Sequence, residues 1–175
     1  MPLTTERVPL SGTWSRQVRS GLDPLELREP RNDGRWQHGD AVGAVYLADD
    51  EDTVWAEWYR ALAEAALPPK VWLPCDLWSI EVDLDDVANL SDEERLGRVD
   101  LPLPEPDRRT WPPYQDAGEA LFAEGCAGVI APSAARPNGL VLCVFEQADQ
   151  LNGLTALDGP TLVAEPPPPP RGMRT

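Results

Sequence analysis

Histidine and paired cysteines are scarce in this sequence. Its 175 residues contain one histidine, His38, and three cysteines, with no CxxC pair. Zinc sites draw on clusters of these residue types, so the sequence predicts no metal site. A serine hydrolase triad would have to use His38, and no GxSxG motif accompanies it. The composition therefore disfavours zinc enzymes and serine hydrolases.

Long apolar runs are also missing. No run of about 18 apolar residues occurs, so we expect no transmembrane helix and no contact with a membrane. The first residues lack the apolar core of a secretion signal. The three cysteines, Cys75, Cys126 and Cys143, are odd in number and widely spaced. This pattern indicates reduced, mostly buried thiols in a cytoplasmic protein.

Positive charge is in short supply. The chain has 15 basic and 30 acidic residues, which gives a formal net charge of -15. Such a surface repels phosphate backbones, so nucleic acid is not an expected partner. A small anion stays compatible with the composition, because a cleft needs only one or two well-placed arginines. The sequence leaves open whether the chain forms a homo-oligomer.

The apolar pattern that is present predicts an α+β fold. The clearest helix covers residues 53–67, where apolar residues recur at helical spacing and two prolines follow. Short helices are expected after Ser91, as the N-cap, and over 116–124. We expect strands near 13–18 and at 44–47, 78–84, 127–130 and 140–145. The prediction is a compact mixed sheet with one main helix and a few short helices.

Three segments divide the chain. Residues 1–12 form an N-terminal arm, residues 13–150 form the domain, and residues 151–175 form a C-terminal tail. Within the domain, the proline-rich stretch 99–114 reads as a loop or insertion rather than an element. A polyproline run in the tail favours polyproline II character, and residues 165–175 are expected to be disordered.

Three motifs and their spacing resemble the RES domain family. Gly34-Arg35-Trp36, Val45-Tyr46-Leu47 and Ala56-Glu57 follow one another, with Arg35 to Tyr46 and Tyr46 to Glu57 each 11 residues apart. The later run from Gly125 to Ser133 is similar to the family's Gly-apolar-Pro-Ser segment. The resemblance covers roughly residues 13 to 147. It departs from the family in a shorter turn after Trp36.

The N-terminal arginine motif of the family matches loosely. Arg16 is the closest counterpart and Arg19 is the alternative, and no aromatic residue follows Arg16 directly. The resemblance implies a fold related to ADP-ribosyltransferases and the degradation of NAD⁺ by hydrolysis or phosphorolysis. NAD⁺ is then the substrate, and no cofactor is implied. Many members of the family are toxins held in check by a partner antitoxin protein.

The chemistry of NAD⁺ cleavage gives each motif residue a role. Breaking the nicotinamide–ribose bond passes through an oxocarbenium-like state, as in glycoside hydrolysis. Arg35 and Glu57 are the predicted catalytic residues: the arginine grips the pyrophosphate and the carboxylate faces the sugar. Arg16, Tyr46 and Ser133 join Arg35 as predicted NAD⁺-binding residues, with Tyr46 holding the nicotinamide ring.

Residue physics alone leaves other interpretations open. The helical pattern places Glu57 away from the apolar stripe, where it would form an exposed pair with Arg60. Tyr46 fits a core position, and Ser133 after Pro132 fits a turn. Two other functions remain: an ADP-ribosyltransferase that passes the ribose to an acceptor, and a non-catalytic domain that binds a nucleotide or a protein.

Overall fold

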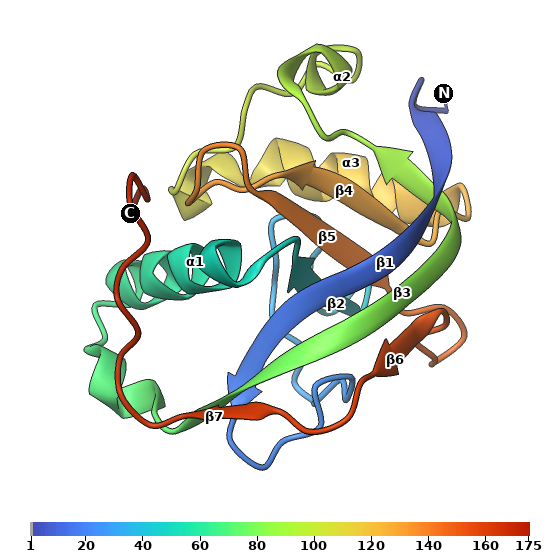
Figure 1. The fold of residues 1–175 in the computed structure, drawn as a ribbon. Helices are drawn as coiled ribbons and strands as arrows, with labels where there is room; N and C mark the ends of the chain where they lie inside the picture. Colours follow the sequence, from blue (N-terminus) through green and yellow to red (C-terminus); the bar gives the residue numbers. More distant parts are fainter. Residues whose placement is uncertain (1) are drawn as a thin grey trace.

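Two long antiparallel strands form the frame of the fold. The computed structural model describes residues 2–175, and its strands β1 (Glu6–Arg19) and β3 (Cys75–Asn89) pair along most of their length (Figure 1). A register shift between Val8 and Leu10 surrounds Pro9, which has no N–H to give to the ladder. The shorter strands are β2 (Ala44–Ala48), β4 (Gly128–Pro132), β5 (Leu140–Phe145), β6 (Leu154–Ala156) and β7 (Thr161–Val163).

All seven strands belong to one mixed sheet. Their order is β1-β2-β5-β4-β3-β6, with β7 also on β3, and only β3 and β4 run parallel. Because β1 pairs with both β2 and β3, the sheet is closed: β1, β2, β5, β4 and β3 form a ring of five hydrogen-bonded strands. The apolar residues on one face of these strands pack on each other, among them Trp14, Val45 and Ile80. The predicted α+β fold with a mixed sheet is confirmed.

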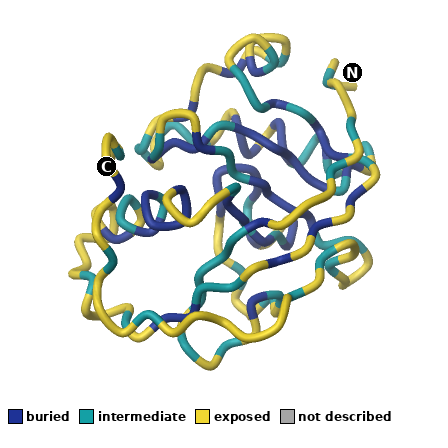
Figure 2. The backbone as a smooth tube through the Cα atoms, viewed as in Figure 1, coloured by how far each residue is buried: buried dark blue, intermediate teal, exposed yellow. Residues whose placement is uncertain are grey.

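The main helix, α1, spans Glu51–Glu64 and covers part of the sheet. It begins two residues before its predicted start, because the carboxylate of Asp50 accepts the N–H of Thr53 and caps it. The predicted apolar stripe is confirmed: Val54, Trp55, Trp58 and Leu62 are buried. They pack against the ends of β2 and β3. Figure 2 shows buried, intermediate and exposed residues following one another along this helix.

Both smaller helices expected from the sequence form, but two details are wrong: the stretch 99–114 as a loop throughout, and Ser91 as an N-cap. The helix expected over 116–124 is α3 (Pro112–Ala123), so the proline-rich stretch 99–114 is not all loop. Two prolines start α3, at positions where their missing N–H groups cost nothing. The residue that caps α2 (Glu93–Gly97) is Asp92, not Ser91, whose hydroxyl donates to Asn89. Two short 3₁₀ helices, η1 (Pro69–Trp72) and η2 (Arg108–Thr110), complete the set.

The sheet reaches beyond the expected domain at both ends. Residues 6–12 of the expected arm pair with β3, and β6 and β7 of the expected tail pair with the same strand. After β7 the chain runs beside α1, where Tyr59 Oη donates to the carbonyl of Pro167 (Figure 1). Farther on, the N–H of Arg174 donates to the carbonyl of Ala135 at 2.6 Å. Disorder over 165–175 stays a prediction.

The three cysteines are free and buried, as the sequence predicts. Burial raises the pKa of Cys143 to about 12 and that of Cys126 to about 11, so both are thiols at neutral pH. In the part of the chain that the structure describes, no helix is long and apolar enough to cross a membrane. Over the same residues, no group of three or more acidic, histidine or cysteine side chains is placed to hold a metal ion.

Candidate active site

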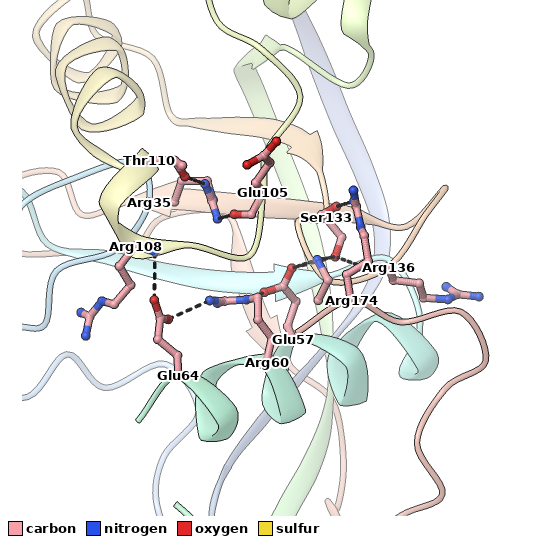
Figure 3. Close-up of polar contacts among 11 residues, drawn as sticks. Arg35, Glu57, Arg60, Glu64, Glu105, Arg108, Thr110, Ser133, Arg136 and Arg174 are labelled. Atoms are coloured by element: carbon pink, nitrogen blue, oxygen red, sulfur yellow. Dashed lines mark hydrogen bonds and ion pairs between the residues drawn. The ribbon is translucent and has the colours of Figure 1, made fainter. Parts of the chain in front are cut away.

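Glu57 and Ser133, which lie far apart in the sequence, are in direct contact. Glu57 projects from α1 and Ser133 follows β4, and the serine Oγ donates a hydrogen bond of 2.7 Å to Glu57 Oε1. The backbone N–H of Ala135 donates to the same oxygen at 3.3 Å. Figure 3 shows the carboxylate pointing from the helix toward this loop. The loop therefore fixes one oxygen of Glu57.

The shape of the Ser133 loop follows from local hydrogen bonds. Ser133 Oγ accepts the backbone N–H groups of Ala135 and Arg136 at 3.1 and 3.0 Å, a pattern typical of serine turns. The Arg136 guanidinium reaches back to Asp50, the cap of α1. Ser133 is only 1% exposed. It is both a turn residue, as its type indicates, and a hydrogen-bond donor to Glu57.

Glu57 carries a fixed negative charge. Burial by itself raises the pKa of Glu57, but the charge of Arg60 and the hydrogen bonds from Ser133, Arg60 and the Ala135 N–H outweigh it and lower the pKa. The carboxylate is therefore ionised at neutral pH. Its side chain is 23% exposed.

Arg35 is a buried cation that has no carboxylate partner among residues 2–175. Its residue is 8% exposed, and its guanidinium donates to the carbonyl of Glu105 at 2.6 Å and to Thr110 Oγ1 at 3.4 Å. The same group lies 5.2 Å from the ring centre of Tyr114 and 5.8 Å from that of Trp111. Neutral acceptors and aromatic rings hold the side chain in place without cancelling its charge.

Arg35 and Glu57 are linked electrostatically rather than by a hydrogen bond. Burial and the repulsion of Arg60 lower the pKa of Arg35, and the opposite charge of Glu57 partly offsets them. Across the described residues, no hydrogen bond joins Arg35 to Glu57. An uncompensated buried charge is costly to a fold. This arrangement leaves a positive group ready to pair with an anion supplied from outside the chain.

Tyr46 supports the turn that presents Arg35. Its hydroxyl accepts the N–H of Trp36 at 3.0 Å and donates to Gln37 Oε1 at 2.7 Å. Gly34 passes so close to this hydroxyl that a Cβ there would collide with it, which explains the glycine of the motif. Tyr46 is partly buried, between a core and a surface position. Its predicted contact with nicotinamide stays a prediction.

Arg16 is a second cation without a carboxylate partner among the described residues. It projects from β1 and donates to the carbonyl of Tyr46 at 3.0 Å, while its Nε is buried without a hydrogen-bond partner in residues 2–175. Burial lowers the pKa of Arg16 to about 10, so the group stays charged at neutral pH. Arg19 is exposed and stacks on Trp72 instead. Of the two arginines, Arg16 contacts the strand that carries Tyr46 and Arg19 does not, and a role of Arg16 in binding NAD⁺ stays a prediction.

Comparison with known proteins identifies the family. A family model described as the RES domain matches residues 12–162. This chain belongs to the RES domain family. A chain in the crystal structure of the M. tuberculosis MbcT–MbcA toxin–antitoxin complex is similar to this RES domain, with 25% sequence identity and a TM-score of 0.75. The match covers 90% of this chain and 87% of that chain. Among curated proteins, none matches the sequence.

Two features of this RES domain's site escaped the sequence-based prediction. Arg60, expected on the exposed surface, has a side chain only 12% exposed and joins Glu57 to Glu64. The stretch 99–114, expected as a loop or insertion, provides the acceptors that hold Arg35. The sequence did carry one signal of this arrangement. Glu57, Arg60 and Glu64 follow one another at spacings of three and four residues, so they fall on one helix face and indicate a row of ion pairs.

Proposed function

We propose that this RES domain degrades NAD⁺ by cleaving the bond between nicotinamide and ribose. The observation that carries the proposal is a pair of opposite charges facing one region. Glu57 is ionised and held by Ser133, while the buried Arg35 has no carboxylate partner in residues 2–175. NAD⁺ matches both, because it carries an anionic pyrophosphate and a ribose carbon that becomes cationic as nicotinamide leaves.

Each residue has a chemical task in this proposal. Arg35 and Arg16 bind the pyrophosphate, for which guanidinium groups are suited as bidentate donors. Glu57 faces the ribose and stabilises the positive charge that develops there. Ser133 orients Glu57 and offers its hydroxyl to a ribose or amide group, and Tyr46 lies beside the nicotinamide. The carbon–nitrogen bond breaks with its electron pair leaving on nicotinamide, and an oxygen of water or phosphate forms the new bond.

We further propose that the chain acts as a toxin with an antitoxin partner. The support is its family and its likeness to a chain of a toxin–antitoxin complex. Expression of the wild type should then arrest the growth of the host, and co-expression of a neighbouring gene product should restore it. Growth unaffected by an expressed, folded and NAD⁺-cleaving protein would rule out the toxin role and leave the enzyme activity intact.

The decisive experiment follows free nicotinamide. The purified protein is incubated with NAD⁺, with and without phosphate, and products are separated by chromatography. Hydrolysis gives ADP-ribose, and phosphorolysis gives ADP-ribose that carries a phosphate on the freed carbon. We expect Glu57→Gln to lower the rate about 100-fold or more, because it removes the charge and keeps the shape. Glu94→Gln, a change of the same kind on the exposed α2, is the matched control.

Three outcomes would overturn parts of this proposal. No release of nicotinamide by the wild type under either condition refutes NAD⁺ cleavage and leaves a nucleotide- or protein-binding domain. Full release by Glu57→Gln refutes the site. Release that requires an added protein acceptor, which then carries the ADP-ribose, identifies an ADP-ribosyltransferase instead.

A further inference from the structure

Arg60 holds the oxygen of Glu57 that the Ser133 loop leaves free. Its Nε donates to Glu57 Oε2 at 2.8 Å, and Ser133 binds the other oxygen. The terminal nitrogen of Arg60 donates to Glu64 Oε2 at 3.1 Å. With its side chain 12% exposed, Arg60 is the least exposed of the three charged groups in this row. The carboxylate of Glu57 is thus held from the loop side and from its own helix.

Glu64 extends this row to the segment that holds Arg35. Its second oxygen, Oε1, accepts the backbone N–H of Arg108 at 2.9 Å, at the start of η2. Thr110, at the end of η2, is one of the two hydrogen-bond acceptors of Arg35. Figure 3 shows the sequence of contacts from Glu57 through Arg60 and Glu64 to Arg108. The two predicted catalytic residues are therefore connected through Arg60.

We propose that Arg60 is a positioning residue for the reaction: it orients the Glu57 carboxylate and, through Glu64, fixes the distance between α1 and the turn that holds Arg35. The inference rests on the proposed cleavage of NAD⁺. A positioning role for Arg60 differs from a role in binding substrate. Arg60 already has two carboxylate partners, whereas Arg35 has none in residues 2–175. A cation whose charge is satisfied within the protein adds little to the binding of an anion.

The charge of Arg60 also acts on Glu57. Two cations face this carboxylate, Arg60 from α1 and Arg35 from the turn after residue 33, and Ser133 and the Ala135 N–H face it from the loop. Arg60 lowers the pKa of Glu57 and opposes the effect of burial, which raises it. Loss of Arg60 therefore moves this pKa upward, and the acidic limb of the activity profile moves to higher pH with it.

The test compares Arg60→Gln and Arg60→Lys with the wild type. We expect Arg60→Gln to lower kcat by up to about 100-fold with little change in KM for NAD⁺, because misplaced groups cost catalysis more than binding. Arg60→Lys keeps the charge, so its acidic limb should stay closer to that of the wild type. Arg98→Gln removes a comparable helical pair, Arg98 to Glu94, on the exposed α2 and serves as the control.

A second measurement does not depend on activity. The carboxyl carbon of Glu57 is titrated by NMR in the free protein, assigned by its absence in Glu57→Gln. Its pKa should be higher in Arg60→Gln than in the wild type and in Arg98→Gln. If the wild type releases no nicotinamide but this shift occurs, the proposed function fails while the link between Arg60 and Glu57 stands. Unchanged kcat and an unchanged pKa in Arg60→Gln overturn the inference, as does a rise in KM alone, which would make Arg60 a substrate-binding cation.

Discussion

Replacing Arg35 by methionine should separate the stability of this domain from its activity. Methionine keeps an unbranched side chain against the rings of Tyr114 and Trp111 and removes the charge. The hydrogen bond to the Glu105 carbonyl contributes about 1.5–3 kcal/mol, and the aromatic contacts contribute about 0.5–2 kcal/mol. The cost of burying the cation is several kcal/mol and opposes both. The three terms nearly cancel, so we expect the free energy of unfolding to change by about 1 kcal/mol or less.

The same variant should lose nicotinamide release about 100- to 1000-fold, as expected when one preorganised electrostatic group is removed. Urea denaturation measures the stability, and the chromatographic assay of nicotinamide measures the activity. Arg136→Met is the contrast, since Arg136 pairs with Asp50 and its loss removes favourable contacts without touching Arg35. If Arg35→Met is destabilised by about 3 kcal/mol or more, as when a buried network is broken, Arg35 has a structural role and the reasoning is wrong.

Three further predictions concern other contacts. Ser133→Ala should lower the free energy of unfolding, measured by urea denaturation, by about 3 kcal/mol. The change removes a hydrogen bond to the ionised Glu57 and leaves the backbone N–H of Arg136 without its acceptor. A loss under about 0.5 kcal/mol, the usual size at a surface position without such contacts, would contradict this. His38 should titrate by proton NMR above its ordinary pKa, because its hydrogen bond to Glu119 and the charge of that residue favour the protonated ring. The stabilisation from this pair is complete below the pKa that His38 has in the unfolded chain, and it disappears as pH rises through the higher pKa of the folded protein. Glu119→Gln should lower the pH midpoint of the His38 titration, and an unmoved midpoint would refute the assignment. Gly34→Ala should lower stability by about 1–3 kcal/mol, because its Cβ would displace the neighbouring tyrosine hydroxyl, and a variant with wild-type Tm would show that the turn relaxes without cost.

Parts of the fold could be predicted because their patterns are strong. The stripe of α1 and the apolar runs of β2 and β5 show their burial in the sequence, and all three form within three residues of the expected bounds. The first half of β1 could not be found, because most of residues 6–13 are exposed and include a proline and a glycine. Strands β6 and β7 have three residues each, too few for a period to appear.

The site shows the same division. The motif order pointed to Glu57 and Ser133, and the structure joins them through one hydrogen bond. The helical pattern alone placed Glu57 on the surface, and its 23% exposed side chain shows why: it lies at the edge of the buried stripe. Arg60 lies beside Glu57 with a side chain only 12% exposed, a value that helical periodicity alone does not give.

The contact between Arg35 and the main-chain carbonyl of Glu105 has a consequence for how this loop can vary. Residue 105 is exposed, and its side chain takes no part in that contact. Any amino acid offers the same carbonyl oxygen. The path of the chain at this point is therefore constrained while the identity of the residue is free, so mutational scanning would find position 105 tolerant even though the arginine depends on it.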